Sequence, residues 1–284
     1  MDPPSPDRVA AARRYYAEDL RFKTRMKSSA LFEAFASVPR ERFVGQGPWL
    51  IQSWGEHWST EEADPRHVYH DTLIALDETR HINNGQPSLW AFYFDRLNVH
   101  AGQRALHLGC GTGYYTAILA ELVGPEGKVV GVEIESELAE RARVALAPWP
   151  QATVICMDGS RGPFDAADVV VASAGATHPM PAWFEAVKPE GKLLFPLTTA
   201  EGNGIMALMT RVSGENFAAR LQGGVSFIGF QGASDPQVSS RLANLLRGNS
   251  SSEVRALRLD AHEEDKTCWL HGEGWCFSRR EPTM

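Results

Sequence analysis

Short apolar runs alternate with amphipathic segments through the middle of the chain. Each run has the length of a buried strand, and the segments between them repeat apolar residues at the three-to-four spacing of a helix. This alternation predicts an α/β fold with a parallel, doubly wound sheet that helices cover on both faces. The strands are expected at 104–111, 128–134, 152–157, 168–176 and 192–198, and the helices at 114–124, 136–146 and 181–188.

The chain before this core has a weaker pattern. Residues 7–37 place apolar side chains at helical spacing, and Val38-Pro39 ends that region because a residue before proline avoids the α conformation. Residues 45–80 show few periodic signals, so loops with short strands are expected there. The aromatic residues of this insert are Trp49, Trp54, Trp58 and Tyr69.

The chain after the core predicts further strands. Two apolar segments, 204–212 and 217–230, flank a Ser-Gly-Glu-Asn turn and predict an antiparallel pair at one edge of the sheet. The chain therefore divides into an N-terminal helical and loop segment (1–80), a core (81–232) and an accessory β-rich C-terminal extension (233–284). Within the extension, a helix is expected at 238–246 and strands at 254–259, 267–270 and 275–278.

Composition narrows the class of protein. The 284 residues include 43% hydrophobic and 22% charged residues, which is ordinary for a soluble globular protein. The formal net charge of −7 and the pI of about 5.7 argue against a nucleic-acid partner, which usually requires a basic surface. The sequence has no apolar run that approaches a membrane span and no apolar segment of a secretory signal, so neither a membrane nor secretion is expected.

The four cysteines indicate a reducing compartment. Cys110 and Cys156 lie in apolar, strand-like surroundings and are expected to be inert core thiols. Cys268 and Cys276 are separated by seven residues and form no Cys-x-x-Cys motif, which argues against a zinc site. We therefore expect no metal and a cytoplasmic location.

A glycine-rich loop and an acid predict a nucleotide-like ligand. In the run LGCGTGYYT, Gly109, Gly111 and Gly113 allow a tight turn and close approach of a ligand to the backbone. Glu133 ends the next strand, where an acid can accept both hydroxyls of a ribose. Dinucleotide-binding folds share this layout, but the G-x-G-x-G spacing, with Tyr114 after the third glycine, favours S-adenosylmethionine (SAM) over NAD. A glycine turn without a ligand is the alternative.

Polar residues also follow other strands. Asp158 comes after the third strand, where an acid can bind the exocyclic amine of an adenine; the alternative is a short acid that caps a turn. His81, His107 and His178 are candidate bases. His107 lies inside the first strand and is expected in the core, whereas His178 follows the fourth strand at the carboxyl edge where ligands bind.

Several blocks of the sequence, spread over roughly residues 37–232, resemble the protein-L-isoaspartate O-methyltransferase family. The resemblance implies a Rossmann-like, doubly wound SAM-methyltransferase sheet and transfer of a methyl group to a carboxylate. The matching blocks are SVPRERFV (37–44), INNGQPSLWA (82–91), RALHLGCGTGYYTAILAELVG (104–124), the post-strand block 158–197 and the late hairpin 211–232.

The resemblance implies SAM as cofactor and S-adenosylhomocysteine as product. Gly109, Gly111, Thr112 and Gly113 would line the methionine part of SAM. Glu133 would bind the ribose, and Asp158 with Gly159 would bind the adenine. The neighbouring residues Cys110, Tyr114 and Ile134 complete the expected cofactor site.

The segment HINNGQPSLW carries the expected catalytic residues. A carboxylate is already nucleophilic at neutral pH, so methyl transfer needs orientation and exclusion of water rather than a strong base. Neutral donors suit that task, and Asn84, Gln86 and Ser88 supply them. Gly85 stands where the family has a hydroxyl residue close to the methyl-transfer centre. The alternative is an Asx turn that caps the helix begun by Pro87.

These observations lead to one hypothesis and two alternatives. The chain is expected to be a SAM-dependent O-methyltransferase that acts on an aspartyl or isoaspartyl carboxylate in a protein or peptide. A modified peptide or a secondary metabolite is the first alternative acceptor, because Gly85 and the aromatic insert depart from the family pattern. A non-catalytic SAM-binding module is the second. The oligomeric state does not follow from the sequence.

Overall fold

The computed structural model describes residues 4–53, 56–248 and 250–283, and it contains two compact units. Unit 1 consists of Met1–Gln103 and Cys110–Cys156, and unit 2 of Arg104–Gly109 and Met157–Met284. This division differs from the three predicted segments 1–80, 81–232 and 233–284. The N-terminal helices pack on a core helix of unit 1, and the C-terminal strands extend a sheet of unit 2, so neither flank stands alone.

Unit 1 begins with two helices instead of the single helical region expected over 7–37. Arg25 adopts a left-handed conformation (φ 55°) that ends the first helix. The hydroxyl of Ser28 then accepts a hydrogen bond from the backbone N–H of Leu31 at 3.1 Å and caps the second. The helices of this unit are α1 (Pro6–Thr24), α2 (Ser29–Ser37), α3 (Pro87–Leu97), α4 (Tyr114–Val123) and α5 (Ser136–Ala145), with short 3-10 helices η1 (Arg40–Phe43) and η2 (Pro65–Val68).

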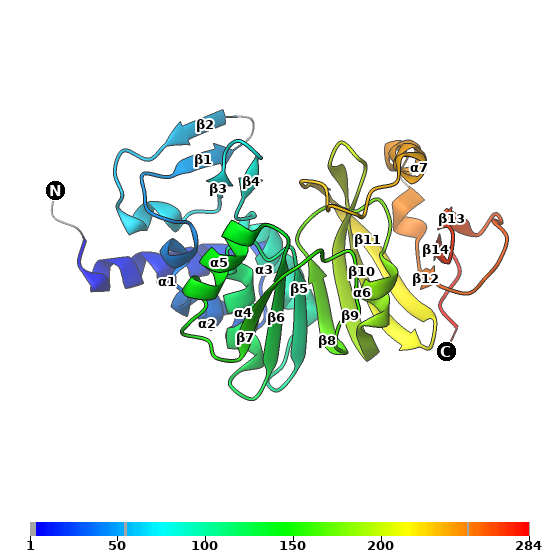
Figure 1. Cartoon of the computed structure of the whole chain (residues 1–284), viewed down its shortest axis with the longest axis horizontal. Coiled ribbons are helices and arrows are strands. Elements are labelled where there is room, and N and C mark those ends of the chain that lie inside the picture. The colour runs from blue at the N-terminus through cyan, green and yellow to red at the C-terminus, as the bar shows by residue number, and fades with distance from the viewer. Residues whose placement is uncertain (1–3, 54–55, 249, 284) are drawn as a thin grey trace. The chain divides into compact units, whose positions relative to one another are not determined.

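The strands of unit 1 include a four-stranded antiparallel sheet and the parallel pair of β6 and β7 (Figure 1). The antiparallel sheet has the order β2-β1-β3-β4 and contains the expected short strands of the insert. Trp49 and Tyr69 of the insert are buried and Trp58 is exposed, whereas Trp54 lies outside the described residues. The strands are β1 (Leu50–Ser53), β2 (Glu56–Ser59), β3 (Leu73–Asp77) and β4 (Ile82–Asn83), and the parallel pair is β6 (Lys128–Glu133) with β7 (Ala152–Cys156).

Unit 2 is built on one mixed sheet. Its strands run in the order β13-β14-β12-β11-β10-β9-β8-β5, with β5, β8 and β9 parallel and the other neighbours antiparallel. The C-terminal extension therefore continues this sheet (orange to red in Figure 1). The strands are β5 (Arg104–Leu108), β8 (Ala167–Ala172), β9 (Val187–Thr198), β10 (Asn203–Ser213), β11 (Asn216–Ser226), β12 (Ala256–Arg258), β13 (Cys268–Gly272) and β14 (Trp275–Ser278); the helices are α6 (Pro181–Glu185), α7 (Pro236–Arg247) and η3 (Ser250–Glu253).

The predicted order of strands and helices is confirmed, as is the antiparallel pair β10–β11. One expectation about the core is wrong. Cys110 is buried, but Cys156 is exposed. It is the last residue of β7, and the preceding Ile155 is exposed as well. All four cysteines lie in the described ranges and are free thiols.

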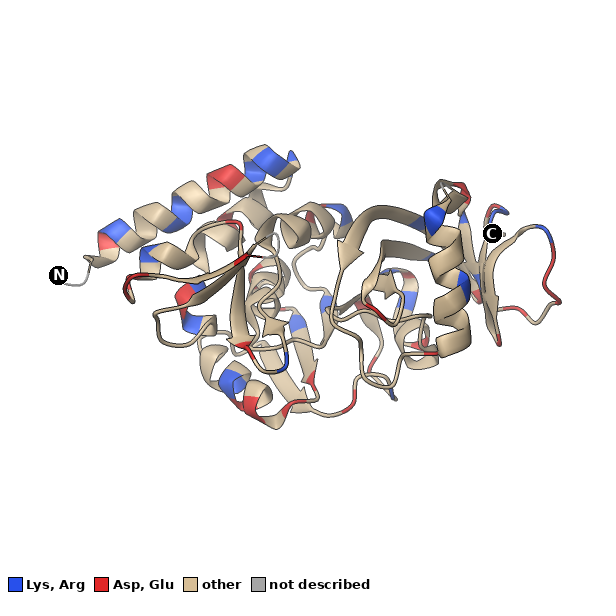
Figure 2. Cartoon of the chain, turned by 90° about the horizontal axis from the view of Figure 1, so that it is seen from above, with Lys and Arg blue, Asp and Glu red and all other residues tan. Residues whose placement is uncertain are grey.

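Charged residues of both signs alternate along α1, the helix that begins near the N-terminus in Figure 2. Asp19 and Lys23 form an ion pair at 2.8 Å on its exposed face, a contact that contributes little to stability. Throughout residues 4–53, 56–248 and 250–283, no helix is both long and apolar enough to cross a membrane. The cytoplasmic location stays a prediction from the sequence.

A buried histidine makes the stability of the fold depend on pH. His107 lies in β5 with its Nε2 atom 2.7 Å from the hydroxyl oxygen of Ser173. Burial disfavours the charged imidazolium and lowers the pKa of His107 to about 3. As the pH falls below about 6.5, His107 becomes protonated in the unfolded chain but stays neutral in the folded chain. The free energy of unfolding therefore decreases below that pH.

Replacing His107 by Gln should remove this pH dependence. Between pH 6.5 and pH 5 the wild-type protein should lose about 1.6 kcal/mol of unfolding free energy relative to His107→Gln. Urea titrations at both pH values measure the difference. The exposed His100, replaced in the same way, serves as the control and should behave as the wild type. A parallel pH dependence of wild type and His107→Gln would contradict the assignment.

Candidate active site

The glycine loop joins β5 to α4, and positive backbone φ angles shape it. Gly109, Gly111 and Gly113 have φ angles of 69°, 56° and 91°, which side-chain-bearing residues rarely adopt. Gly113 is the N-cap of α4, and a Cβ atom there would lie 2.9 Å from Cδ1 of Leu146. The loop therefore requires glycine for its conformation and, at Gly113, for space. Gly109 and Gly111 are half-buried, so part of the loop backbone is accessible to a ligand.

Glu133, the last residue of β6, is held by the backbone around the loop. Its Oε2 atom accepts a hydrogen bond from the Gly111 N–H at 2.7 Å, and its Oε1 atom accepts one from the Glu135 N–H at 3.0 Å. Burial raises the pKa of Glu133, although these backbone N–H groups oppose the shift. Each carboxylate oxygen has two acceptor positions, so one on each oxygen stays available for a hydroxyl group.

The other expected cofactor residues of unit 1 divide between core and surface. The side chain of Cys110 packs against Gly131, where a Cβ atom would lie 3.0 Å from its sulfur. Thr112 donates its hydroxyl to the Phe43 carbonyl at 2.6 Å, and the Tyr114 ring packs among aromatic rings of the N-terminal helices. These three can offer only backbone groups to a ligand. Ile134 is 36% exposed and presents an apolar surface directly after Glu133.

Unit 2 contains the remaining predicted cofactor residues. Asp158 forms a tight turn in which its Oδ1 atom accepts hydrogen bonds from the Ser160 N–H at 2.8 Å and from the Ser160 hydroxyl at 2.7 Å. The Gly159 carbonyl accepts the indole N–H of Trp183 at 2.8 Å, and a Cβ atom on Gly159 would lie 2.9 Å from the Phe230 ring. Asp158 therefore satisfies the turn alternative with one oxygen, while its Oδ2 atom lies 3.5 Å from Nε of the exposed Arg161.

A buried arginine fixes the expected catalytic segment. Arg40 is fully buried and donates hydrogen bonds from Nη1 and Nη2 to the backbone carbonyls of Val68, His70 and Thr72, each at 2.7 Å. Its Nη2 atom also donates to Oδ1 of Asn84 at 3.2 Å.

Asn84 is thereby fixed in one orientation. Its Oδ1 atom accepts a second hydrogen bond, from the Ile74 N–H at 3.0 Å. The amide nitrogen of Asn84 is buried and has no hydrogen-bond partner among the described residues. This amide is therefore a donor whose direction is set by Arg40, which the sequence did not identify as part of the site. The VPRERFV motif was the available signal for Arg40, but its arginines carried no predicted role.

Gly85 has no room for a side chain. Its φ angle is 74°, and a Cβ atom would lie 2.6 Å from Nε1 of Trp90 and 3.1 Å from Cε2 of Tyr115. Trp90 is fully buried and cannot easily move. The Gly85 N–H donates to Oδ1 of Asn83 at 3.0 Å, which is the Asx turn given above as the alternative. The Gly85 carbonyl accepts the Tyr115 hydroxyl at 2.9 Å, which connects this segment to α4.

The other two expected catalytic residues stand at the start of α3. Gln86 is the N-cap residue and its side chain is exposed. Ser88 is half-buried, and its backbone N–H donates to Oδ1 of Asp71 at 2.8 Å. Unit 1 thus places Asn84, Gln86 and Ser88 on one short connection, tied through Tyr115 to the helix that follows the glycine loop.

The candidate histidine bases have separate surroundings. His107 is in the core, as expected, and His81 is exposed. His178 in unit 2 stacks on Trp275 of the extension at 6.0 Å between ring centroids, and its Nδ1 atom is 2.8 Å from the Thr177 hydroxyl. Burial lowers the pKa of His178, which favours the neutral imidazole.

Comparison with known proteins agrees with these features. The family model for protein-L-isoaspartate(D-aspartate) O-methyltransferase matches residues 14–235. The chain is 31% identical to the protein-L-isoaspartate O-methyltransferase of Methanothermobacter thermautotrophicus over 76% of this chain and 93% of that protein. It is 30% identical to protein-L-isoaspartate O-methyltransferase 2 of Archaeoglobus fulgidus over 76% of this chain and 91% of that protein.

Solved structures show the same fold. A protein-L-isoaspartate O-methyltransferase structure aligns with 81% of this chain and 69% of its own, at a TM-score of 0.63 and 23% identity. A Plasmodium falciparum protein, described as a beta-aspartate methyltransferase in complex with S-adenosyl-L-homocysteine, aligns with 77% of this chain and 98% of its own, at a TM-score of 0.62 and 16% identity. The predicted α/β class with N-terminal helices and a β-rich extension is confirmed.

The contact at Gly85 generates a testable prediction. Gly85→Ser should destabilise the protein by about 1–3 kcal/mol more than Gly102→Ser, because a Cβ atom at 85 overlaps the buried Trp90 ring. Gly102 is a matched control: its φ angle is 81°, and no described atom lies within 4 Å of its added Cβ atom. Both changes share the strain of a positive φ angle, so chemical denaturation isolates the overlap. Equal losses would contradict the crowding of this site.

Proposed function

Because the chain belongs to the protein-L-isoaspartate(D-aspartate) O-methyltransferase family, we propose that it transfers a methyl group from SAM to the carboxylate of an isoaspartyl residue in a protein or peptide. The observation that carries the proposal is the family match, which includes the glycine loop, Glu133 and the Asn84 segment together. The relatives named above, at about 30% identity, support the same substrate class.

The described residues fit the proposed cofactor. The positive φ angles of the glycine loop let backbone N–H groups approach a carboxylate closely, and backbone carbonyls an ammonium, as the methionine part of SAM requires. Glu133 keeps acceptor positions for two ribose hydroxyls, and the exposed Ile134 supplies an apolar surface for a purine. We assign the binding of the adenine amine to Asp158. Gly159 would contact the adenine through its backbone. Cys110, Thr112 and Tyr114 contribute through their backbone, since their side chains are engaged elsewhere.

SAM supplies an activated methyl group on a positively charged sulfur. The task of the protein is then to hold a carboxylate oxygen in line and to exclude water. Asn84 suits this task because Arg40 and Ile74 fix its amide oxygen, which leaves the amide nitrogen as an oriented neutral donor. Gln86 and Ser88, on the same connection, are proposed to contact the acceptor. A neutral donor orients the carboxylate without a cation that would lower its nucleophilicity.

One observation favours a different acceptor as the second candidate. Gly85 replaces the hydroxyl residue that the family resemblance implies at this position, and Trp90 excludes a side chain there. A modified peptide or a small-molecule carboxylate is the acceptor that this altered connection would suit. The protein would remain a SAM-dependent methyltransferase in that case.

The first test is methyl transfer itself. With radiolabelled SAM, a peptide that contains an isoaspartyl residue should gain a base-labile methyl ester, whereas the matching aspartyl peptide should not. Loss of the label at alkaline pH identifies the ester. If S-adenosylhomocysteine binds but the isoaspartyl peptide gains no ester, the substrate assignment is wrong. A mass increase of one methyl group on another acceptor then supports the second candidate, and its absence everywhere supports a binding module.

The second test concerns Glu133. Glu133→Gln should weaken S-adenosylhomocysteine binding roughly 10- to 100-fold, because an amide offers one acceptor oxygen and no charge to the ribose hydroxyls. Calorimetric titration measures the affinity. Glu140→Gln on the exposed face of α5 is the matched control and should bind as the wild type. Thermal unfolding without ligand separates lost binding from lost folding. Unchanged affinity in a folded Glu133→Gln variant would contradict the ribose role.

A further inference from the structure

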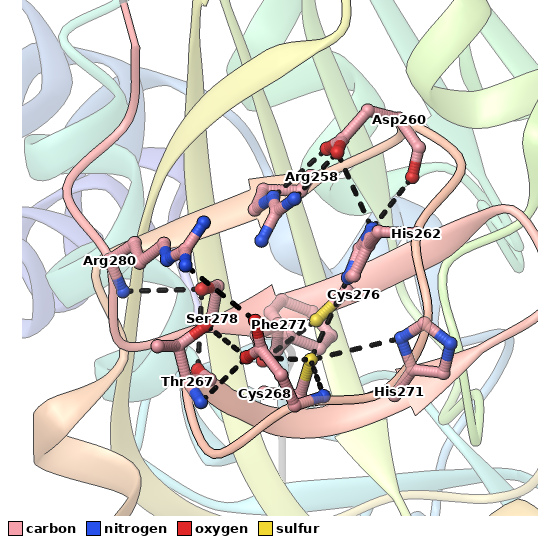
Figure 3. Close-up of polar contacts among 11 residues, drawn as sticks. Arg258, Asp260, His262, Thr267, Cys268, His271, Cys276, Phe277, Ser278 and Arg280 are labelled. Carbon is pink, nitrogen blue, oxygen red and sulfur yellow. Dashed lines mark hydrogen bonds and ion pairs between the residues drawn. The ribbon is translucent and has the colours of Figure 1, made fainter.

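Four metal-ligating side chains converge in the C-terminal extension. They are His262, Cys268, His271 and Cys276, and one ligand atom of each lies within 4.8 Å of those of the other three. His262 comes from the loop after β12, Cys268 and His271 from β13, and Cys276 from β14 (Figure 3). Both cysteines are buried and both histidines are half-buried. The sequence argument against a zinc site considered only the spacing of the two cysteines.

Two of the ligand-to-ligand distances are close to those of a tetrahedral site, and all the others are within 4.8 Å. The Cys268 sulfur is 3.6 Å from Nε2 of His262 and 3.9 Å from Nδ1 of His271. With zinc–sulfur and zinc–nitrogen bonds of about 2.3 and 2.05 Å, tetrahedral geometry places a sulfur and a nitrogen ligand about 3.5 Å apart. The measured separations are therefore close to the edge of such a tetrahedron.

The surroundings of His262 set its tautomer for metal binding. Its Nδ1 atom is 2.8 Å from the backbone carbonyl of Asp260 and 3.4 Å from the Asp260 carboxylate. An N–H on Nδ1 satisfies that carbonyl and leaves the lone pair on Nε2, the atom nearest the Cys268 sulfur. Arg258 holds the Asp260 carboxylate through two hydrogen bonds, at 2.9 and 2.5 Å. Partners of this kind orient metal-bound histidines in proteins.

The turn before β13 presents Cys268. The Asp265 backbone N–H points at the Cys268 sulfur at 3.4 Å, and the Cys268 N–H donates to the Asp265 carbonyl at 3.0 Å. A backbone N–H directed at sulfur stabilises a thiolate. The Asp265 carboxylate is 3.7 Å from the same sulfur, and it also accepts hydrogen bonds from the backbone and hydroxyl of Thr267.

We propose that His262, Cys268, His271 and Cys276 bind one structural zinc ion. Two thiolates and two neutral imidazoles fill a tetrahedral shell and neutralise the charge of the ion, so no position remains open for a substrate. The donor set of sulfur and imidazole favours zinc over calcium or magnesium. The ion would join the loop after β12 to the β13–β14 hairpin. This inference is independent of the proposed methyl transfer.

Metal content of the full-length protein is the direct test. Protein purified without chelator and without added metal should contain roughly one equivalent of zinc by elemental mass spectrometry. Replacing zinc by Co²⁺ should give the visible bands of tetrahedral cobalt and a sulfur-to-cobalt charge-transfer band. Chelation should lower the melting temperature, and added Zn²⁺ should restore it. A protein without zinc that also fails to bind added Zn²⁺ or Co²⁺ would overturn the proposal.

Variants separate this site from adventitious binding. Cys268→Ser with Cys276→Ser should abolish the metal and the charge-transfer band. If the double variant fails to fold, His271→Ala is the variant to use. It changes a half-buried position, so it should keep the fold and weaken Co²⁺ binding. Cys156→Ser and His57→Ala, both exposed residues of unit 1, are matched controls and should retain full metal content. Loss of metal in the controls, or its retention in the double variant, contradicts the proposed ligands.

A disulfide is the competing state of the two cysteines. Alkylation of the unfolded, unreduced protein followed by mass spectrometry counts free thiols. Four free thiols after zinc release agree with the proposal. A bond between Cys268 and Cys276 in freshly purified protein would overturn it.

Discussion

The burial of the Arg40 guanidinium is the constraint on which unit 1 depends. A charge removed from water is costly unless hydrogen bonds compensate it. Here the terminal nitrogens donate to three carbonyls of the insert and to the Asn84 amide oxygen, and the centroids of the Tyr16 and Tyr114 rings each lie 5.8 Å from Cζ. The Nε atom has no hydrogen-bond partner among the described residues. The Arg40 side chain thus holds together the insert, the N-terminal helices and the segment that contains Asn84. A lysine lacks the planar fork that makes this possible.

Hydrogen bonds to a buried side chain also hold the glycine loop. Glu133 is buried, yet two backbone N–H groups stabilise its charge, and one of them belongs to the loop itself. The acid therefore shapes the glycine loop. The Thr112 hydroxyl of this loop donates to the Phe43 carbonyl. The VPRERFV motif therefore supports the glycine loop through Phe43 and the Asn84 segment through Arg40.

The sequence predicted the elements well where periodicity alone decides them, as in α4, β6 and the β10–β11 pair. It failed where a single backbone conformation or a distant neighbour decides. Arg25 breaks the first helical region through a left-handed φ angle that no pattern announces. The crowding of Gly85 depends on Trp90 and Tyr115, which converge only in the fold. The His–Cys cluster was missed because its ligands come from a loop and a hairpin, and the pairing of His271 with Cys276 exists only in that register.

The contacts of Asn84 and Gly85 also affect how readily this segment is damaged chemically. Asn84-Gly85 is the dipeptide type most prone to form isoaspartate, the lesion on which the family acts. Formation begins when the glycine nitrogen attacks the asparagine side-chain carbonyl. In this fold the Gly85 N–H is engaged by Asn83, and Arg40 and Ile74 hold the Asn84 amide oxygen. The contacts that fix Asn84 and Gly85 therefore also oppose this reaction, and that protection lasts only while the protein is folded.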